Sequence, residues 1–120
     1  MKILFVEDEP AVLDVLSRML EIFGKHEVIG RTSSTEALNL FSRNPELFDV
    51  VITDQTMPNM KGTELAQRIL CVRPAMPIIL CTGYDTEDLK KEANALGIQG
   101  FVSKPSTFMD ILKIIDDVVK

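Results

Sequence analysis

Short apolar runs alternate with amphipathic stretches along the whole chain. Three runs are continuously apolar, at residues 3–6, 50–52 and 78–80, and shorter pairs stand at 28–29 and 101–102. A strand that is buried on both faces of a parallel sheet has this unbroken apolar pattern. We therefore expect three central strands at the longer runs and two flanking strands at the shorter ones.

The segments between these runs carry apolar residues at helical spacing. The first segment places six of them on one face: Val12, Val15, Leu16, Met19, Leu20 and Phe23. Gly24 follows as a stop signal, and Ser33 with Glu36 resembles a capping box before a second helix. Asp85 is the expected cap of a fourth helix, which Gly97 would end. The pattern predicts five strands that alternate with five helices.

Strict alternation of strands and helices predicts an α/β fold, in which helices cover both faces of a parallel sheet. The crossovers between parallel strands would be right-handed. Ligands in such folds bind outside the carboxyl ends of the strands. The residues that follow each predicted strand are therefore where a functional site is expected.

Acids, a hydroxyl group and a lysine follow the predicted strands. They are Glu7, Asp8 and Glu9 after the first strand, Asp54 after the third, Thr82 after the fourth and Lys104 after the fifth. Each has an ordinary explanation when taken alone, since acids favour helix N-termini and Thr-Gly is a common turn. Their joint placement at one edge of the sheet favours a functional site.

This set of side chains restricts the chemistry. Carboxylates and carbonyl oxygens make a hard-oxygen site that suits Mg²⁺ rather than Zn²⁺. An aspartate carboxylate such as that of Asp54 can attack phosphorus, and phosphoryl transfer needs mainly positioning and charge neutralisation. The metal and Lys104 would neutralise charge on the phosphoryl group, and Thr82 would help to position it by hydrogen bonding. The chain has a single histidine, His26, so a histidine-based site is not expected.

Four separated motifs resemble the receiver domain of bacterial response regulators. They are residues 5–10 (Phe-Val-Glu-Asp-Glu-Pro), Asp54 with residues 57–62 (Met-Pro-Asn-Met-Lys-Gly), Thr82-Gly83, and Lys104-Pro105. Their order and spacing agree along the chain, so the resemblance implies a single receiver domain over residues 1–120. It also implies a flavodoxin-like, doubly wound sandwich of five strand–helix units, with a parallel sheet in the order 2-1-3-4-5.

The resemblance implies a phosphoacceptor and a Mg²⁺ site. Asp54 would accept the phosphoryl group. Asp8 would bind the metal directly and Glu7 mostly through water, while Asp54 and the backbone carbonyl of Thr56 would complete the protein ligands. Glu7 stands where the family more often has aspartate, and its longer side chain should still reach the metal through water.

The resemblance also implies a conformational switch. Lys104 would pair with the phosphoryl oxygens, and its bond to Pro105 is expected to be cis. Thr82 would turn toward the phosphoryl group, and the ring of Phe101 would move inward with it. This movement would remodel the face made by the fourth helix, the fifth strand and the fifth helix. Phe101 lacks the hydroxyl group of a tyrosine, so we expect a simpler or weaker switch.

Two further positions would tune the lifetime of the acyl phosphate in such a domain. Thr56 lies two residues after Asp54, and Tyr84 lies two residues after Thr82. A ring at Tyr84 would shield the phosphoryl group from water. A surface aromatic without that role is an equally good interpretation of Tyr84.

The implied partner is a histidine kinase or a histidine phosphotransfer protein, which would donate the phosphoryl group from a phosphohistidine. Residues of the first helix and the adjacent loops would select this partner. The remodelled face would control a partner or an attached domain, and a weak homodimer through it is left open. Residues 54–58 and 78–84 also resemble receivers of hybrid sensor histidine kinases. We therefore expect either a stand-alone receiver or a piece of such a kinase.

Charge and composition narrow the remaining classes. The chain has 13 Lys and Arg against 18 Asp and Glu, a formal net charge of −5. We therefore expect this domain itself to bind neither nucleic acid nor a membrane. No apolar run is long enough to span a bilayer, and the first residues carry acids where a signal peptide would be apolar. Cys71 and Cys81 form no CxxC pair. A cytoplasmic domain with reduced thiols is the expectation.

Three other functions remain open. A phosphatase-like hydrolase with an aspartyl nucleophile typically has Asp-x-Asp, whereas this chain has Asp54-Gln55-Thr56. A flavin or nucleotide carrier lacks support, because neither a GxGxxG nor a GxxxxGK[ST] motif is present. An inactive pseudo-receiver that serves as a binding module is disfavoured by the intact acids and lysine. We expect a phosphoacceptor that promotes its own phosphorylation and dephosphorylation rather than a turnover enzyme.

Overall fold

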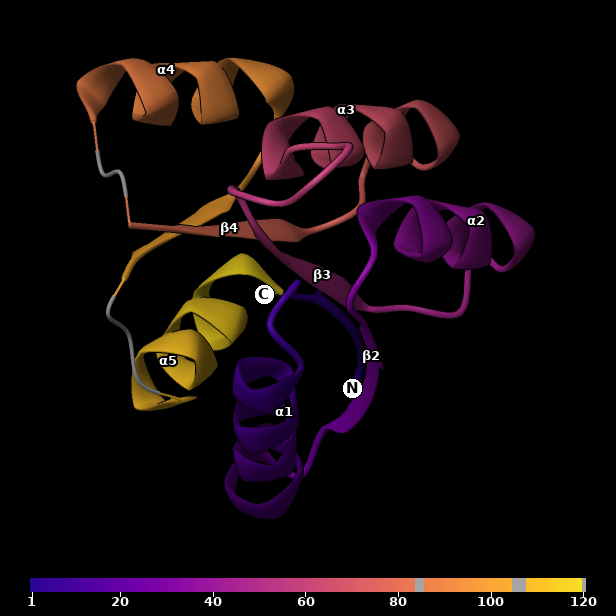
Figure 1. The fold of residues 1–120 in the computed structure, drawn as a ribbon, viewed down its shortest axis with the longest axis vertical. Coiled ribbons are helices and arrows are strands. Elements are labelled where there is room, and N and C mark those ends of the chain that lie inside the picture. The colour runs from indigo at the N-terminus through magenta and orange to yellow at the C-terminus, as the bar shows by residue number, and fades with distance from the viewer. Residues whose placement is uncertain (84–85, 105–107, 120) are drawn as a thin grey trace.

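The computed structural model describes residues 1–83, 86–104 and 108–119, in which strands and helices alternate throughout (Figure 1). The strands are β1 (Lys2–Val6), β2 (Glu27–Arg31), β3 (Val50–Asp54), β4 (Ile78–Thr82) and β5 (Gly100–Ser103). The helices are α1 (Pro10–Gly24), α2 (Ser34–Arg43), α3 (Gly62–Val72), α4 (Glu87–Leu96) and α5 (Phe108–Val118). The predicted order of elements is confirmed. Asp54 and Thr82 are the last residues of their strands.

Within the described ranges, the strands form one parallel sheet in the order β2-β1-β3-β4-β5, which confirms the implied order. At its centre, Val6 of β1 is in register with Thr53 of β3, and Asp54 is in register with Cys81 of β4. Because parallel strands all point the same way, their carboxyl ends meet at one edge of the sheet. The sheet therefore brings the ends of β1, β3 and β4 side by side.

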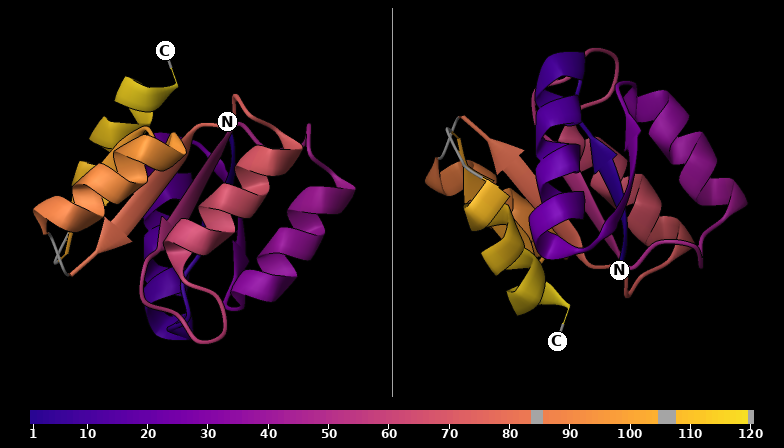
Figure 2. Two further views of the ribbon diagram at one scale, coloured as in Figure 1. Left: turned by 90° about the horizontal axis from the view of Figure 1, so that it is seen from above. Right: turned by 90° about the horizontal axis from the view of Figure 1, so that it is seen from below.

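Helices cover both faces of the sheet. Figure 2 shows α2, α3 and α4 on one face and α1 and α5 on the other. Phe41 and Leu65 pack in the core cluster on the first face, and Leu20 and Ile115 pack in the cluster on the second. Every residue of β3 and β4 is buried, since both strands lie between these two cores. Burial on both faces explains their unbroken apolar runs.

Two predicted helix signals are confirmed and one is wrong. Ser33 caps α2, because its side chain accepts a hydrogen bond from the Glu36 amide at 3.3 Å. Gly97 ends α4 in the left-handed conformation, with φ of 95°. The cap of α4 is Thr86 and not Asp85, which lies outside the described residues. Thr86 directly precedes the first helical residue, and its side chain accepts a hydrogen bond from the third helical amide at 3.2 Å.

The end of α1 lies one residue later than predicted. Gly24 is still helical, and the left-handed residue that ends the helix is Lys25, with φ of 57°. The glycine leaves room for packing instead, because a Cβ at position 24 would lie 2.5 Å from Leu112 Cδ2 of α5 and would displace that side chain. The glycine therefore allows α1 and α5 to approach each other.

Gly62 begins α3 where the chain passes closest to the end of β3. A Cβ at this position would overlap the backbone carbonyl oxygen of Asp54 and would lie 2.8 Å from Leu80 Cδ1. The Gly62 amide also donates a hydrogen bond to the Gln55 carbonyl at 3.0 Å. Glycine is therefore what allows α3 to begin against the strand that carries Asp54.

The substitution Gly62→Ala is expected to lower the free energy of unfolding by about 2 kcal/mol, because the obstructing oxygen belongs to the backbone of a buried strand. Gly83→Ala is the matched control, since a Cβ there would meet nothing within 4 Å. Urea unfolding of the two variants measures the difference. Equal stability of Gly62→Ala and the parent would show that the start of α3 relaxes without cost.

Candidate functional site

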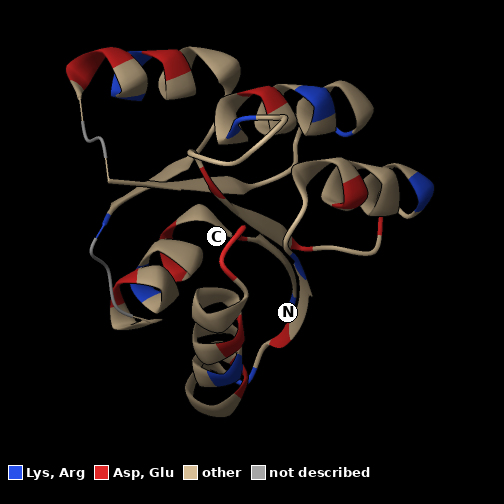
Figure 3. Cartoon of the chain, in the orientation of Figure 1, with Lys and Arg blue, Asp and Glu red and all other residues tan. Residues whose placement is uncertain are grey.

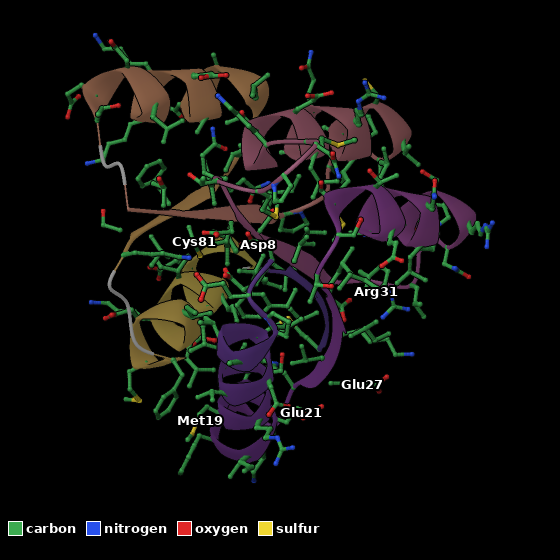
Figure 4. All side chains as sticks on the ribbon, viewed as in Figure 1. Asp8, Met19, Glu21, Glu27, Arg31 and Cys81 are labelled. Atoms are coloured by element: carbon green, nitrogen blue, oxygen red, sulfur yellow. The ribbon has the colours of Figure 1, made fainter. Side chains whose placement is uncertain are left out.

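Three carboxylates gather at the carboxyl edge of the sheet. Glu7 and Asp8 follow β1, Asp54 ends β3, and one oxygen from each side chain lies within 4.8 Å of the others. Figure 3 shows the acidic segments in red on the β1–α1 connection and at the end of β3, and Figure 4 labels Asp8 on that connection. Glu7 and Asp54 are only 3% and 6% exposed. Like charges buried this closely repel each other, so the group requires a cation.

The ammonium group of Lys104 supplies one positive charge. Its Nζ lies 2.7 Å from Asp54 Oδ1 and 3.3 Å from Glu7 Oε2. The Lys104 amide donates a hydrogen bond to the Thr82 carbonyl at 2.7 Å, which fixes the backbone from which the side chain departs. Partial burial lowers the pKa of Lys104, but the hydrogen bond and charge of Asp54, and then those of Glu7, raise the pKa overall. Lys104 is therefore protonated at neutral pH.

Burial and the charge of Asp54 raise the pKa of Glu7, and Lys104 and the Glu9 amide oppose that rise only in part. Three carboxylates and one ammonium group carry a formal charge of −3 + 1 = −2. A divalent cation would balance this charge. Because the donors are carboxylate oxygens, without nitrogen or sulfur, the site fits Mg²⁺ better than Zn²⁺.

The acids after β1 do not serve as helix caps. Glu9 occupies the N-cap position of α1, but its side chain makes no capping hydrogen bond, and the first turn of the helix contains no acid. Glu7 instead faces Lys104, and its Oε1 accepts a hydrogen bond from the Glu9 amide at 3.4 Å. A role at the N-terminus of α1, which is the ordinary explanation for acids at this point of the chain, is therefore wrong for Glu7.

Thr82 and Phe101, the two predicted switch residues, lie on the neighbouring strands β4 and β5. Thr82 is 1% exposed and follows Cys81, the register partner of Asp54. Phe101 is partly buried and packs on the core cluster beneath α2–α4. Lys90 of α4 places its Nζ 5.8 Å from the centroid of the Phe101 ring, within the range of a cation–π interaction. The ring is therefore held between the core and a cation.

The segment between β3 and α3 follows the acids and contains Thr56, which is exposed. It makes a tight turn in which the Met60 amide donates to the Pro58 carbonyl at 2.8 Å, with Asn59 at φ of 71°. A positive φ at a residue other than glycine is uncommon and needs support from its surroundings. The position of Thr56 therefore depends on how firmly the ends of this segment are held.

Gln55 holds one end of that segment, and the sequence did not indicate it. Its Oε1 accepts a hydrogen bond from the Thr63 amide at 2.8 Å, and its Nε2 donates to Thr63 Oγ1 at 3.3 Å. A glutamine after a strand looks like an ordinary turn residue. Only the proximity of β3 and α3 in the fold gives it a partner, so no local signal could have identified it.

Cys81 lies beside the acids but has no part in their chemistry. Burial raises the pKa of its thiol to about 12, and the charge of Asp54 adds to that rise. The thiol is therefore protonated and unreactive at neutral pH. Cys71, by contrast, is exposed on α3, and both cysteines are free, as predicted.

Two predicted site residues lie outside the described residues. They are Tyr84, proposed to shield the phosphoryl group, and Pro105, expected to follow a cis bond. Both remain predictions. The structure does bring together Glu7, Asp8, Asp54 and Lys104, the last of which directly precedes Pro105 in the sequence.

Lys and Arg positions, coloured blue on the ribbon, are spread over several elements in the view of Figure 3. The expectation that this domain does not bind nucleic acid stays a prediction. Among the described residues, no helix has the length and apolar character needed to cross a membrane.

Comparison with known proteins identifies the family. A model described as the response regulator receiver domain matches residues 3–116. The crystal structure of a response regulator receiver domain protein from Clostridium thermocellum superposes with a TM-score of 0.92 at 36% identity, over 98% of this chain and 93% of that one. The chain therefore belongs to the response regulator receiver domain family. Members of this family work in two-component phosphorelay signalling, and they generally bind Mg²⁺ at an acidic cluster.

Two curated relatives show the settings in which similar domains occur. The response regulator protein FleR of Pseudomonas aeruginosa is 34% identical over 114 residues, which cover 95% of this chain and 24% of that protein. The sensor histidine kinase RcsC of Salmonella typhimurium is 33% identical over 113 residues, which cover 94% of this chain and 12% of that protein. The chain thus spans about a quarter or less of the length of these relatives.

Proposed function

We propose that residues 1–120 form one receiver domain, in which Asp54 accepts a phosphoryl group from the phosphohistidine of a histidine kinase or a histidine phosphotransfer protein. The observation that carries this proposal is the position of the Asp54 carboxylate. It lies 2.7 Å from Lys104 Nζ and belongs to the group of acids that fits a divalent cation. In this proposal, a nucleophile, a fixed positive charge and a metal site would act together at one edge of the sheet.

In the proposed step, a carboxylate oxygen of Asp54 attacks the phosphorus atom of the phosphohistidine. The O–P bond forms as the P–N bond breaks, and the electron pair of the broken bond remains on the imidazole nitrogen of the donor. Lys104 would hold a phosphoryl oxygen by charge and hydrogen bonding, and the hydroxyl group of Thr82 would bind another. No proton on Asp54 has to be removed, since an ionised carboxylate is already the nucleophile.

For the metal, we propose that Asp8 and Asp54 bind Mg²⁺ directly, that Glu7 acts mainly through water, and that the carbonyl of Thr56 completes the protein ligands. The burial of Glu7 and Asp54 and the proximity of all three carboxylates support this assignment. Bound Mg²⁺ would neutralise charge on the phosphoryl oxygens during transfer.

For the response, we propose that phosphorylation moves Thr82 and then Phe101, which remodels the α4–β5–α5 face. The packing of the Phe101 ring between the core and Lys90 supports a ring that responds to movements of β4 and α4. Thr56 and Tyr84 would set how long the acyl phosphate lasts. A weak homodimer through the α4–β5–α5 face belongs to the same proposal.

We propose that the phosphoryl donor docks on α1. This helix begins at Pro10, directly after the acids, and its outward face is unusually apolar, with Val15 53% and Ile22 66% exposed. Ala11, Val12, Val15 and Leu16 line a shallow apolar depression of about 390 Å³ on this face. An apolar face of this kind is typical of a contact surface for another protein. The docked donor would lie beside Asp54.

We further propose that the domain acts as a reversible switch, either alone or within a hybrid histidine kinase. The similarity to RcsC supports the second setting, and the similarity to FleR supports a separate response regulator. The residue two positions after Asp54 is Thr56, so the general acid of an aspartyl phosphatase has no counterpart there. A slow transfer to and from Asp54 fits this arrangement better than turnover of a substrate.

The protein incubated with Mg²⁺ and acetyl phosphate is expected to gain one phosphoryl group, because a small phosphodonor requires only the site itself. Intact-mass spectrometry measures the adduct. A parallel sample with EDTA should show almost none, since the charges around Asp54 then lack the cation. The proposal fails if no adduct forms, or if EDTA leaves its yield unchanged.

A further inference from the structure

We infer that Gln55 is a positioning residue for the proposed Mg²⁺ site, because it fastens the backbone beside Thr56 to the start of α3. The inference rests on the proposed function, since it concerns the same metal site. Gln55 lies between Asp54, one proposed ligand, and Thr56, whose carbonyl is another. Any shift of residue 55 would therefore move two ligands relative to each other.

The backbone of Gln55 is held on two sides. Its amide donates a hydrogen bond to the Cys81 carbonyl of β4 at 2.9 Å, and its carbonyl accepts one from the Gly62 amide at 3.0 Å. These bonds continue the β3–β4 pairing by one residue and join it to the first residue of α3. The strand end and the helix start are thus connected through this residue.

The side chain of Gln55 replaces a missing helix cap. Lys61, at the N-cap position of α3, makes no side-chain capping bond. The Thr63 amide in the first turn donates instead to Gln55 Oε1 at 2.8 Å, while Gln55 Nε2 donates to Thr63 Oγ1 at 3.3 Å. The amide group of glutamine is needed for both bonds, because it offers an acceptor and a donor on one side chain.

The two side-chain hydrogen bonds between Gln55 and Thr63 form a clamp that closes the short segment containing Thr56. The segment from 56 to 61 includes Asn59 with φ of 71°, a conformation that persists only when the surroundings enforce it. With residues 55 and 63 bonded to each other, the segment has both ends fixed. Without the clamp it would adopt more conformations, and the Thr56 carbonyl would be less well placed for the metal.

A purely structural cap would affect stability alone, so the test compares stability with Mg²⁺ affinity. The main variant is Gln55→Leu, which removes both side-chain bonds at similar volume. Thr63→Val removes only the bond to Thr63 Oγ1 and leaves the helix amide bonded, so it serves if Gln55→Leu folds poorly. Ser33→Ala is the matched control, because it removes the cap of α2, a helix that carries none of the proposed metal ligands.

Isothermal titration with MgCl₂ gives the dissociation constant of each variant, and urea unfolding in EDTA gives its stability. We expect Gln55→Leu to weaken Mg²⁺ binding about tenfold and Thr63→Val to weaken it less. Ser33→Ala should lower the unfolding midpoint while binding Mg²⁺ as the parent does. If the parent binds Mg²⁺ and both Gln55→Leu and Thr63→Val bind it equally well, this inference is overturned. If the parent itself does not bind Mg²⁺, the proposed function fails, and the inference about Gln55 fails with it.

Discussion

Asp54→Asn is expected to abolish the phosphoryl adduct while leaving the fold intact. The amide of asparagine is not a nucleophile toward phosphorus, and neither remaining acid is well placed to replace the carboxylate. Glu7 is buried and hydrogen-bonded to Lys104, with a pKa raised by burial, and Asp8 is expected to be occupied by the metal. Asparagine has nearly the same shape as aspartate, so β3 keeps its register with β4.

Intact mass after incubation with Mg²⁺ and acetyl phosphate measures this loss, and circular dichroism checks the fold. The matched control is Asp49→Asn, at the opposite end of β3, where an exposed carboxylate accepts a hydrogen bond from the Lys2 amide. Asp49→Asn should be phosphorylated like the parent. An adduct of similar yield on Asp54→Asn would place the phosphoryl group on a different residue and would refute the assignment.

Lys104→Met is expected to slow phosphorylation about a hundredfold without weakening Mg²⁺ binding. Methionine retains most of the apolar length of lysine but lacks the charge that lies 2.7 Å from Asp54 Oδ1. Removing a fixed charge that stabilises a transition state typically costs a factor of this size. The metal, by contrast, loses a neighbouring positive charge that repels it, so its affinity should be unchanged or higher.

The two halves of this prediction are measured separately, by the rate of adduct formation and by titration with MgCl₂. Lys91→Met is the control, because Lys91 is exposed on α4. It should match the parent in both measurements. If Lys104→Met is phosphorylated at the parent rate, Lys104 only pairs with the carboxylates in the resting protein and does not assist transfer.

The fold was predictable because its central strands are buried on both faces. Runs such as 50–52 and 78–80 have no polar residue, as is typical of a strand between two layers of helices, and both strands are confirmed. Local errors occurred where two neighbouring residues suit the same role. Thr86 rather than Asp85 caps α4, and Lys25 rather than Gly24 takes the left-handed conformation, because tertiary packing decides between such neighbours.

The acids of the site were predictable for a topological reason. Residues that follow parallel strands must share one edge of the sheet, so the proximity of Glu7, Asp8 and Asp54 follows from their places in the sequence. The supporting contacts were not predictable. Gln55 meets Thr63, and Lys90 meets Phe101, only because α3 and α4 pack at particular positions on the sheet. Such contacts depend on three-dimensional packing and leave no periodic pattern.

Phe101 shows what the structure adds to the proposed switch. A tyrosine at this position could be held by a hydrogen bond through its hydroxyl group. Here the ring is held by apolar packing and by the ammonium group of Lys90, 5.8 Å from its centroid. Movement of α4 would therefore change the surroundings of the ring directly, which fits the proposed remodelling of the α4–β5–α5 face.

If Asp54 itself carries the phosphoryl group, chemical mapping of the phosphorylated protein should locate the group at this residue. An acyl phosphate is reduced by borohydride to a primary alcohol, which marks the aspartate that carried it. Protein phosphorylated in the presence of Mg²⁺ is reduced, digested and examined by peptide mass spectrometry. We expect homoserine at position 54 and nowhere else. A mark at Glu7 or Asp8, or none at position 54 despite an adduct on the intact protein, would contradict it.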